Sequence, residues 1–353
     1  CDELDSLAQE LSPALTEHSN NISLNQKLFL RIKAVHDEQA ANGFHDLDPE
    51  QQRLLEQTYK GFVRGGANLS DAGKEELRRI TSELSLLTLQ FSQNKLKDTK
   101  DFQLHITREA DLAGLPQSSR DSARQEAKDR GLEGWVFTLH APSYGPFMQY
   151  SERADLRRRM YMAYNTLCTH DNACNNIEIC RRLVNLRLDY ARLLGYPTYA
   201  DFVLEERMAE TPGNVYQLLN QLTEAYRPVA VGEVAALAAM PENPATAEAP
   251  ATPASDGSPQ AATVQPWDFA FLSNKLRQQK YQLDSEMLRP YFELSRVKQG
   301  IFSLATRLYG ITFKRNTAIP VYHEGVEAYE VYDRDGAFLA VFYCDFFPRP
   351  TKK

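Results

Sequence analysis

The chain has 353 residues, of which 42% are hydrophobic and 25% are charged, and a formal net charge of −7. This composition is typical of a globular protein large enough for two or three domains. The acidic balance argues against nucleic acid or an anionic membrane as a partner, and no apolar run approaches the roughly 20 residues of a membrane span. Arginine pairs and a triplet (78–79, 157–159 and 181–182) lie among acidic residues in helical patterns, and we interpret them as solvated helix faces.

The sequence holds five cysteines, Cys1, Cys168, Cys174, Cys180 and Cys344. An odd and sparse set in a chain of this length does not indicate a disulfide framework. The sequence starts at Cys1 without Met or a signal-peptide pattern. We therefore expect an internal piece of a longer protein with a cytoplasmic location. A lipid-modified mature N-terminus is the alternative.

In chain order, the first predicted elements are amphipathic helices. Residues 50–64 place their apolar side chains on one side and are followed by a Gly-Gly pair, which favours a helix end. The next helix, 70–98, carries an apolar stripe at 3-4 spacing, formed by Leu77, Ile80, Leu84, Leu87 and Phe91. Such a stripe is compatible with a coiled coil. We favour antiparallel packing inside a globular bundle.

Two alternating runs interrupt the helices. Residues 102–107 and 135–140 alternate apolar and polar side chains, which predicts two strands that pair as a small sheet. Residues 118–131 between them are predicted to form a polar helix. A Pro/Gly loop is expected from Pro142, followed by a helix that Ser151 opens.

Further helices are predicted between residues 175 and 240. The first ends at Gly195 and has a predicted apolar face of Ile177, Cys180, Val184, Leu188, Ala191 and Leu194. Thr198 is expected to cap a short helix, and Thr211 with Pro212 to start a longer one.

Residues 241–265 differ in composition from the rest of the chain. They are rich in Pro, Ala, Thr and Ser, and contain no aromatic residue and no Lys or Arg. Ordering a residue costs about 1–2 kcal/mol, and this composition has little apolar surface to offset that cost. We predict a mobile surface insertion, with a partner-binding segment as the alternative.

Regular structure is predicted to resume at Trp267. A helix that ends at Gly310 aligns Val297, Ile301, Leu304 and Leu308, and strands follow at 311–315, 326–333 and 337–347. The predicted fold class is mainly α, a multi-helix structure with small β elements. Its predicted divisions are a helical lobe at 1–240 that includes the small sheet, the insertion at 241–265, and a region at 266–353 where helices lead to a β-hairpin.

A search for catalytic motifs finds no glycine-rich phosphate loop and no Gly-x-Ser-x-Gly elbow. Four residues of zinc-ligand type lie together in the sequence: Cys168, His170, Cys174 and Cys180. Their spacing lacks the tight Cys-x2–4-Cys knuckle of zinc sites. We interpret the cysteines as buried structural residues.

His323 and Glu324 resemble the first half of a His-Glu-x-x-His zinc motif, but the second histidine is replaced by Glu327. On an extended chain at about 3.3 Å per residue, positions 323 and 327 would lie about 13 Å apart, too far to share one ion. The carboxylate pairs Glu205-Glu206 and Glu327 with Glu330 have no distinctive catalytic spacing. From the residues alone we expect no catalytic, cofactor-binding or metal-binding residue in this chain.

Six ordered segments, 18–35, 59–69, 83–94, 186–215, 265–281 and 288–313, resemble the thimet-oligopeptidase family of zinc peptidases, most closely its bacterial peptidyl-dipeptidase (dipeptidyl carboxypeptidase) branch. The resemblance covers nearly the whole chain apart from 241–265. It implies a two-lobed, mainly helical fold around a channel that admits unfolded oligopeptides. Zinc would activate water and polarise the peptide carbonyl, and C-terminal dipeptides would be released.

The resemblance also implies where the catalytic residues lie. In this family the stretch 321–353 leads into a Gly-Gly-Ala segment, and the zinc-binding His-Glu-x-x-His helix follows later. We therefore expect the zinc ligands to lie beyond Lys353, and this chain to be a part without the catalytic lobe that binds no zinc and is inactive alone. It would contribute channel wall and a small sheet near the path of oligopeptide substrates. The alternative is a free-standing helical peptide-binding or scaffold protein.

Overall fold

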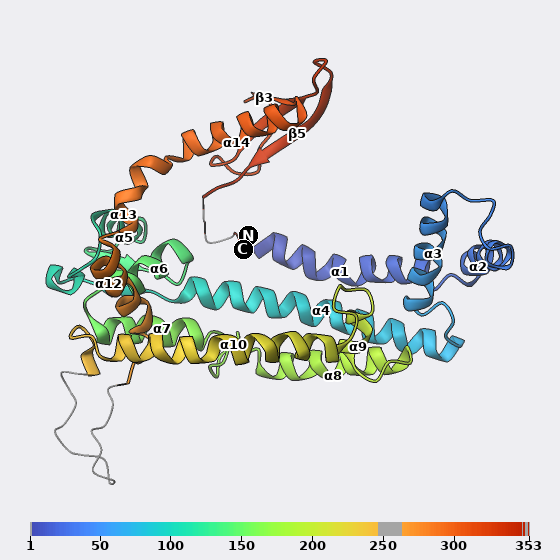
Figure 1. Cartoon of the computed structure of the whole chain (residues 1–353), viewed down its shortest axis with the longest axis horizontal. Helices are drawn as coiled ribbons and strands as arrows, with labels where there is room; N and C mark the ends of the chain where they lie inside the picture. The colour runs from blue at the N-terminus through green and yellow to red at the C-terminus, as the bar shows by residue number, and fades with distance from the viewer. Residues whose placement is uncertain (1, 246–262, 348, 350–351, 353) are drawn as a thin grey trace, which may run out of the picture. The chain divides into compact units, whose positions relative to one another are not determined.

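The computed structural model describes residues 2–245, 263–347, 349 and 352. These residues form a mainly helical structure with two small antiparallel sheets (Figure 1), which confirms the predicted fold class. Of the predicted insertion at 241–265, residues 246–262 lie outside the described residues. The prediction of mobility there therefore stays a prediction.

The chain divides into two compact units, each built from two separate stretches of sequence. Unit 1 comprises Cys1–Asp101 and Thr166–Gly232, and unit 2 comprises Phe102–Asn165 and Glu233–Lys353. The divisions predicted from sequence, 1–240, 241–265 and 266–353, were drawn along the chain by composition and element type. The two units group residues by spatial contact, so they do not test these divisions.

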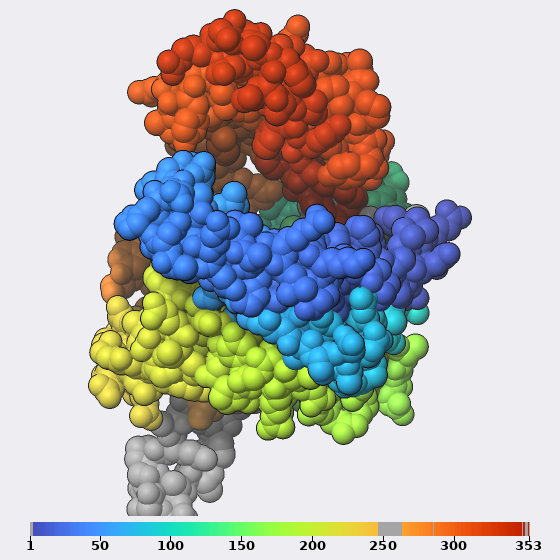
Figure 2. Space-filling view, turned by 90° about the vertical axis from the view of Figure 1, so that its right-hand side faces the viewer, coloured from blue at the N-terminus to red at the C-terminus, as the bar shows by residue number. Residues whose placement is uncertain are grey.

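Unit 1 is helical. Its helices are α1 (Asp2–Ser23), α2 (Gln26–Ala41), α3 (Pro49–Arg64), α4 (Asp71–Asp101), α8 (Ile177–Leu193), α9 (Tyr199–Leu204) and most of α10 (Pro212–Ala238). The long helix α4 packs against α1 on one side and α8 on the other (Figures 1 and 2). It runs antiparallel to both (Figure 1). Leu77 and Ile80 of its predicted stripe are buried, because two helices cover this part of α4.

The predicted helix ends of unit 1 are confirmed by their capping contacts. Gly65 is the C-cap of α3, and its N–H donates to the carbonyl of Gly61 at 2.8 Å. Thr198 begins α9 with a capping box that includes Asp201. The Thr211 hydroxyl accepts from the N–H of Asn214 at 3.2 Å. These contacts satisfy backbone groups that the first and last turns of a helix leave without partners.

Unit 2 combines helices with the two sheets. Its helices are α5 (Gln117–Asp129), α6 (Ala141–Tyr150), α7 (Ala154–Asn165), α12 (Phe269–Tyr281), α13 (Ser285–Leu288) and α14 (Leu294–Tyr309), with short 3-10 turns at Glu109–Leu112 and Arg289–Phe292. Strands β1 (Leu104–Ile106) and β2 (Trp135–Phe137) pair antiparallel. Strands β3 (Thr312–Arg315), β4 (Glu327–Tyr332) and β5 (Phe338–Cys344) form the second sheet in that order. The predicted strand pairing and C-terminal hairpin are thus confirmed.

The expected Pro/Gly loop after residue 142 is wrong, because these residues form α6. Pro142 lies in the first turn, where its missing N–H costs nothing and its fixed φ suits a helix. Phe147, Met148 and Tyr150 are buried in the second half of the helix. Their burial outweighs the poor helix propensity of Gly145 and Pro146.

The predicted apolar face of α8 is wrong in its first half. Ile177 and Val184 are 53% and 65% exposed, and Cys180 is exposed as well. The buried residues are Ile179, Leu183 and Leu186, together with Ala191, which the prediction places correctly. This helix carries apolar side chains on two sides, and the spacing alone could not show which side α4 covers.

Helix α14 likewise presents its aligned apolar stripe away from the sheet. Val297, Ile301, Leu304 and Leu308 are all exposed. The helix contacts the sheet through another face, where the ring of Phe302 stacks on Phe313 with centroids 4.2 Å apart.

Arg157 contradicts the interpretation of the 157–159 triplet as a solvated face, because its side chain is fully buried. Its guanidinium forms an ion pair with Asp268, which begins α12 and is also buried. It also donates to the carbonyl of Ser151, and it lies 4.1 Å from the ring centroid of Phe271. A charge inside a protein needs such partners, since it has lost its hydration.

The described residues of the 241–265 segment, which ends a few positions before Asp268 in the sequence, form contacts of their own. Asn243 is fully buried and donates to the carbonyl of Ala238 at 3.1 Å and that of Thr263 at 3.5 Å. Leu237, Met240, Phe271 and Leu272 form a buried apolar cluster there, with Val264 and Leu276 packed against it. The described residues on either side of 246–262 are therefore joined by this contact and packed on one apolar cluster.

We predict that Arg157→Met lowers the free energy of unfolding by about 3–5 kcal/mol, because it leaves the Asp268 carboxylate buried without a counter-charge. Both tryptophans, Trp135 and Trp267, lie in unit 2, so tryptophan fluorescence during urea unfolding is a direct measurement. Arg159→Met is the matched control, since Arg159 is exposed on the same helix. Equal destabilisation by the two changes would contradict the prediction.

Candidate functional site

His323 lies in a turn before β4, as expected from its position ahead of an alternating run. Its Nδ1 accepts from the N–H of Gly325 at 3.0 Å, and its carbonyl accepts from the N–H of Val326 at 3.0 Å. Glu324 beside it is exposed. The histidine therefore closes a local turn, and its ring is engaged by the backbone two residues on.

Glu327 has a partner that the sequence pattern did not show. Its carboxylate forms an ion pair with Lys298 from α14 and accepts a hydrogen bond from the Tyr329 hydroxyl at 2.7 Å. Arg315 of β3 lies 3.6 Å from the same carboxylate. Lys298, followed by Tyr329, holds the pKa of Glu327 below its usual range. Glu327 thus links the helix to the sheet.

Glu330 is separated from Glu327 by three positions of the same strand, so the two side chains point to opposite faces of the sheet. Glu330 accepts from the Tyr332 hydroxyl at 2.6 Å and from the Asn316 amide at 2.8 Å. These two carboxylates cannot act on one group.

The second carboxylate pair, Glu205 and Glu206, is divided between two cations of α3. Glu205 pairs with Arg64, and Glu206 pairs with Lys60. The Arg64 guanidinium also lies 4.2 Å from the ring centroid of Phe202. The pair therefore fixes the segment after α9 on α3 within unit 1.

The cysteine cluster is only partly as expected. Cys168 and Cys174 are buried, as predicted, but Cys180 is exposed, because it lies on the uncovered side of α8. Burial raises the pKa of the Cys168 thiol to about 11 and also raises that of Cys174. The ring Nε2 of His170 lies 3.2 Å from the Thr166 hydroxyl.

A zinc site needs three or four ligands grouped around one point. Within residues 2–245, 263–347, 349 and 352, no three His, Cys, Asp or Glu side chains are grouped so that they could hold a metal ion.

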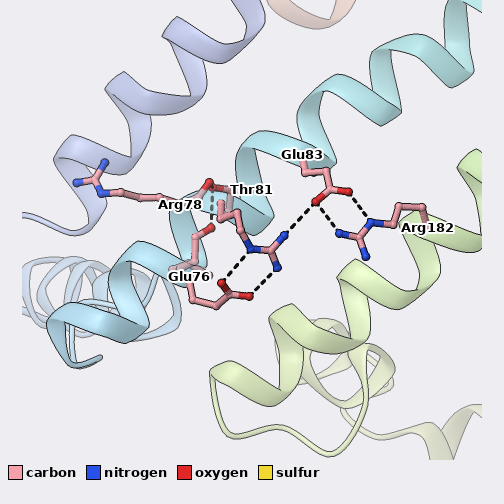
Figure 3. Close-up of polar contacts among 7 residues, drawn as sticks. Glu76, Arg78, Thr81, Glu83 and Arg182 are labelled. Carbon is pink, nitrogen blue, oxygen red and sulfur yellow. Dashed lines mark hydrogen bonds and ion pairs between the residues drawn. The ribbon is translucent and has the colours of Figure 1, made fainter.

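Exposed charges on α4 and α8 form a continuous network. Arg79 binds Glu76 at 2.6 Å and Glu83 at 3.1 Å, and Glu83 also binds Arg182 of α8 (Figure 3). The contact with Arg182 holds the pKa of Glu83 below its usual range. Three of these four charged residues lie on α4 and one lies on α8. The network therefore joins two helices of unit 1, and we assign it to packing.

One cavity with both polar and apolar lining residues was not anticipated from the sequence. Its volume is about 260 Å³, and it lies in unit 2 between α5, the end of β2 and the start of α6. His140, Ser119 and Ser143 are among its lining residues. No sequence signal marks it, because its groups come from α5, β2, α6 and Arg349 near the C-terminal end of the sequence, and none belongs to a motif.

No helix among the described residues combines the length and the apolar character needed to cross a membrane.

We expect Glu327→Gln to destabilise the protein by about 1 kcal/mol at neutral pH, the size of a partly exposed charged hydrogen bond. Because the pKa of Glu327 is lower in the folded state, its contribution is present above the unfolded-state pKa and is lost as pH falls through the folded-state pKa. Urea unfolding at several pH values should show the difference from the unchanged protein shrinking in acid.

Glu324→Gln serves as the matched control for that experiment, because Glu324 is exposed and neighbours the same strand. A pH-independent difference, or an equal effect of the control, would argue against the ion pair.

For the cysteines, we expect alkylation of the folded protein at mildly alkaline pH to label Cys180 well before Cys168, Cys174 and Cys344. Cys180 is exposed, whereas the other three are buried and burial raises their pKa values. Peptide mass spectrometry at successive times resolves each site, and denatured protein controls for intrinsic peptide differences. Simultaneous labelling of all four would show the assigned burial to be wrong.

Residues 147–353 match the sequence profile of Peptidase family M3. Dipeptidyl carboxypeptidase of Escherichia coli K12 is 34% identical over 353 residues, which cover 99% of this chain and 49% of that protein. Oligopeptidase A of the same strain is 32% identical, with 99% and 50% covered. Probable cytosolic oligopeptidase A of Arabidopsis thaliana is 33% identical, with 99% and 49% covered.

The chain spans about half the length of the curated relatives that it matches. The family match covers more than half of the chain, and the relatives align along nearly all of it. The resemblance to the thimet-oligopeptidase family is thereby confirmed, and the chain belongs to peptidase family M3.

Proposed function

We propose that this chain forms a non-catalytic part of a zinc-dependent oligopeptidase that hydrolyses short, unfolded peptides. The observation that carries the proposal is the alignment of 99% of the chain with a dipeptidyl carboxypeptidase and with oligopeptidase A at 34% and 32% identity. In the whole protein, zinc would activate a water molecule and polarise the scissile carbonyl. The protein would act in the cytoplasm.

The described residues support a structural role for this part. Glu205, Glu206 and Glu327 are each engaged by a cation of a neighbouring element. The buried thiols of Cys168 and Cys174 are held protonated by burial. A general base or a metal ligand must be free to exchange protons or bind an ion, and these groups are already used in packing.

Release of C-terminal dipeptides is the finer part of the proposal. The two Escherichia coli relatives differ by only two percentage points in identity and carry different activities in their names. The products therefore decide between them: successive dipeptides from the C-terminus indicate the carboxypeptidase mode, and internal cleavage indicates the oligopeptidase mode.

We expect the protein encoded by the uninterrupted reading frame around this chain to cleave short peptides and to lose activity on chelation. The 353-residue chain alone should hold no stoichiometric zinc and cleave nothing. Elemental analysis, mass spectrometry of peptide products and a chelator series measure these outcomes.

A folded protein of similar amino-acid composition is the control for the restriction to unfolded peptides, and it should not be cleaved. Stoichiometric zinc with chelator-sensitive cleavage in the chain alone would overturn the non-catalytic role. Peptide binding without cleavage by the complete reading frame would instead favour a helical peptide-binding scaffold.

A further inference from the structure

The cavity of unit 2 is lined by polar side chains and by four apolar residues, Ala123, Val136, Phe137 and Pro142. Its volume of about 260 Å³ is many times the roughly 10–15 Å³ that a single water molecule needs. Ser119, Ser122 and Glu126 line one wall from α5, at spacings of three and four residues that place them on one face of the helix. His140 and Ser143 line it from the start of α6.

His140 is held in place on one side only. Its Nδ1 lies 3.2 Å from the hydroxyl of Thr138, which is buried. The Thr138 N–H in turn donates to the Ser143 hydroxyl at 2.9 Å. Nε2 of His140 is buried and has no hydrogen-bond partner among the described residues. A buried polar atom without a partner costs about 1–3 kcal/mol, so the arrangement calls for a group that satisfies it.

Two charged side chains, Arg349 and Glu126, line the cavity, and each is paired with a group outside the lining. Arg349 lines it, and its guanidinium is fixed by Asp345 through contacts of 2.8 and 2.9 Å. Asp345 also binds Lys352 at 3.1 Å, so two cations share one carboxylate. Glu126, the acidic residue of the α5 wall, is already paired with Arg130 at 2.8 Å.

We propose that this cavity is a binding site for a small oxyanion, the carboxylate or phosphate group of a low-molecular-weight ligand. A guanidinium has five N–H donors, and Asp345 takes two of those of Arg349, so further N–H groups can donate to such an oxyanion. The hydroxyls of Ser119 and Ser143 add donors from α5 and α6. When the Thr138 hydroxyl donates to Nδ1 of His140, Nε2 carries the proton and donates as well. The site does not depend on the proposed peptidase activity.

Isothermal titration of the 353-residue chain with sodium phosphate and, separately, with sodium acetate tests the proposal at constant ionic strength. We expect saturable binding of one ion per chain for at least one of the two probes. Phosphate alone, acetate alone or both would identify the preferred group. Arg349→Gln and His140→Ala should each weaken binding by about tenfold or more, which corresponds to about 1.4 kcal/mol.

Lys128→Gln is the matched control for charge, because Lys128 is an exposed cation on α5 outside the cavity. This variant should bind phosphate or acetate as the unchanged chain does. Circular dichroism would reveal whether His140→Ala impairs folding. In that case Ser119→Ala, which removes a single hydroxyl from the cavity lining, replaces it and should also weaken binding. Absence of saturable binding for both probes would overturn the proposal. Equal binding by Arg349→Gln, Ser119→Ala and the unchanged chain would do so too.

Discussion

The fold of unit 2 depends on the buried ion pair between Arg157 and Asp268. Both groups are shielded from water, so each requires the other, and the carbonyl of Ser151 and the ring of Phe271 complete the surroundings of the arginine. The pair fixes α7 against the start of α12 and defines where the chain returns after the 241–265 segment. An apolar pair would pack as well but would not specify a single partner so strictly.

Much of the secondary structure could be predicted because it is determined locally. Alternation gave the β1–β2 pair, and capping residues such as Thr198 gave helix ends, since both reflect short-range geometry. Burial was less predictable because it depends on neighbours distant in sequence. Arg157 cannot be distinguished from Arg158 and Arg159 by composition, and α8 has apolar residues on two sides, of which α4 covers one.

The same distinction explains the candidate site. The missing second histidine was sufficient to reject a helical zinc motif around His323. The extended chain expected between positions 323 and 327 is wrong, because residues 323–326 form a turn in which the His323 carbonyl accepts from the N–H of Val326. The partner of Glu327 could not be predicted, since Lys298 comes from a helix 29 positions earlier. The cavity around His140 was unpredictable for a similar reason: a helix, a strand end and a distant arginine contribute to it, and none of these groups has a distinctive sequence context.

The separation of Arg157 and Asp268 by 111 positions has a consequence for synthesis on the ribosome. At about 5–20 residues per second, Asp268 is added roughly 5–20 s after Arg157. During that time α7 can form, but its charged face cannot be enclosed, so unit 2 has to wait for α12. Unit 1 has both of its stretches by Gly232 and can complete its packing earlier. The order of folding is therefore set by chain connectivity rather than by the position of each unit's first residue.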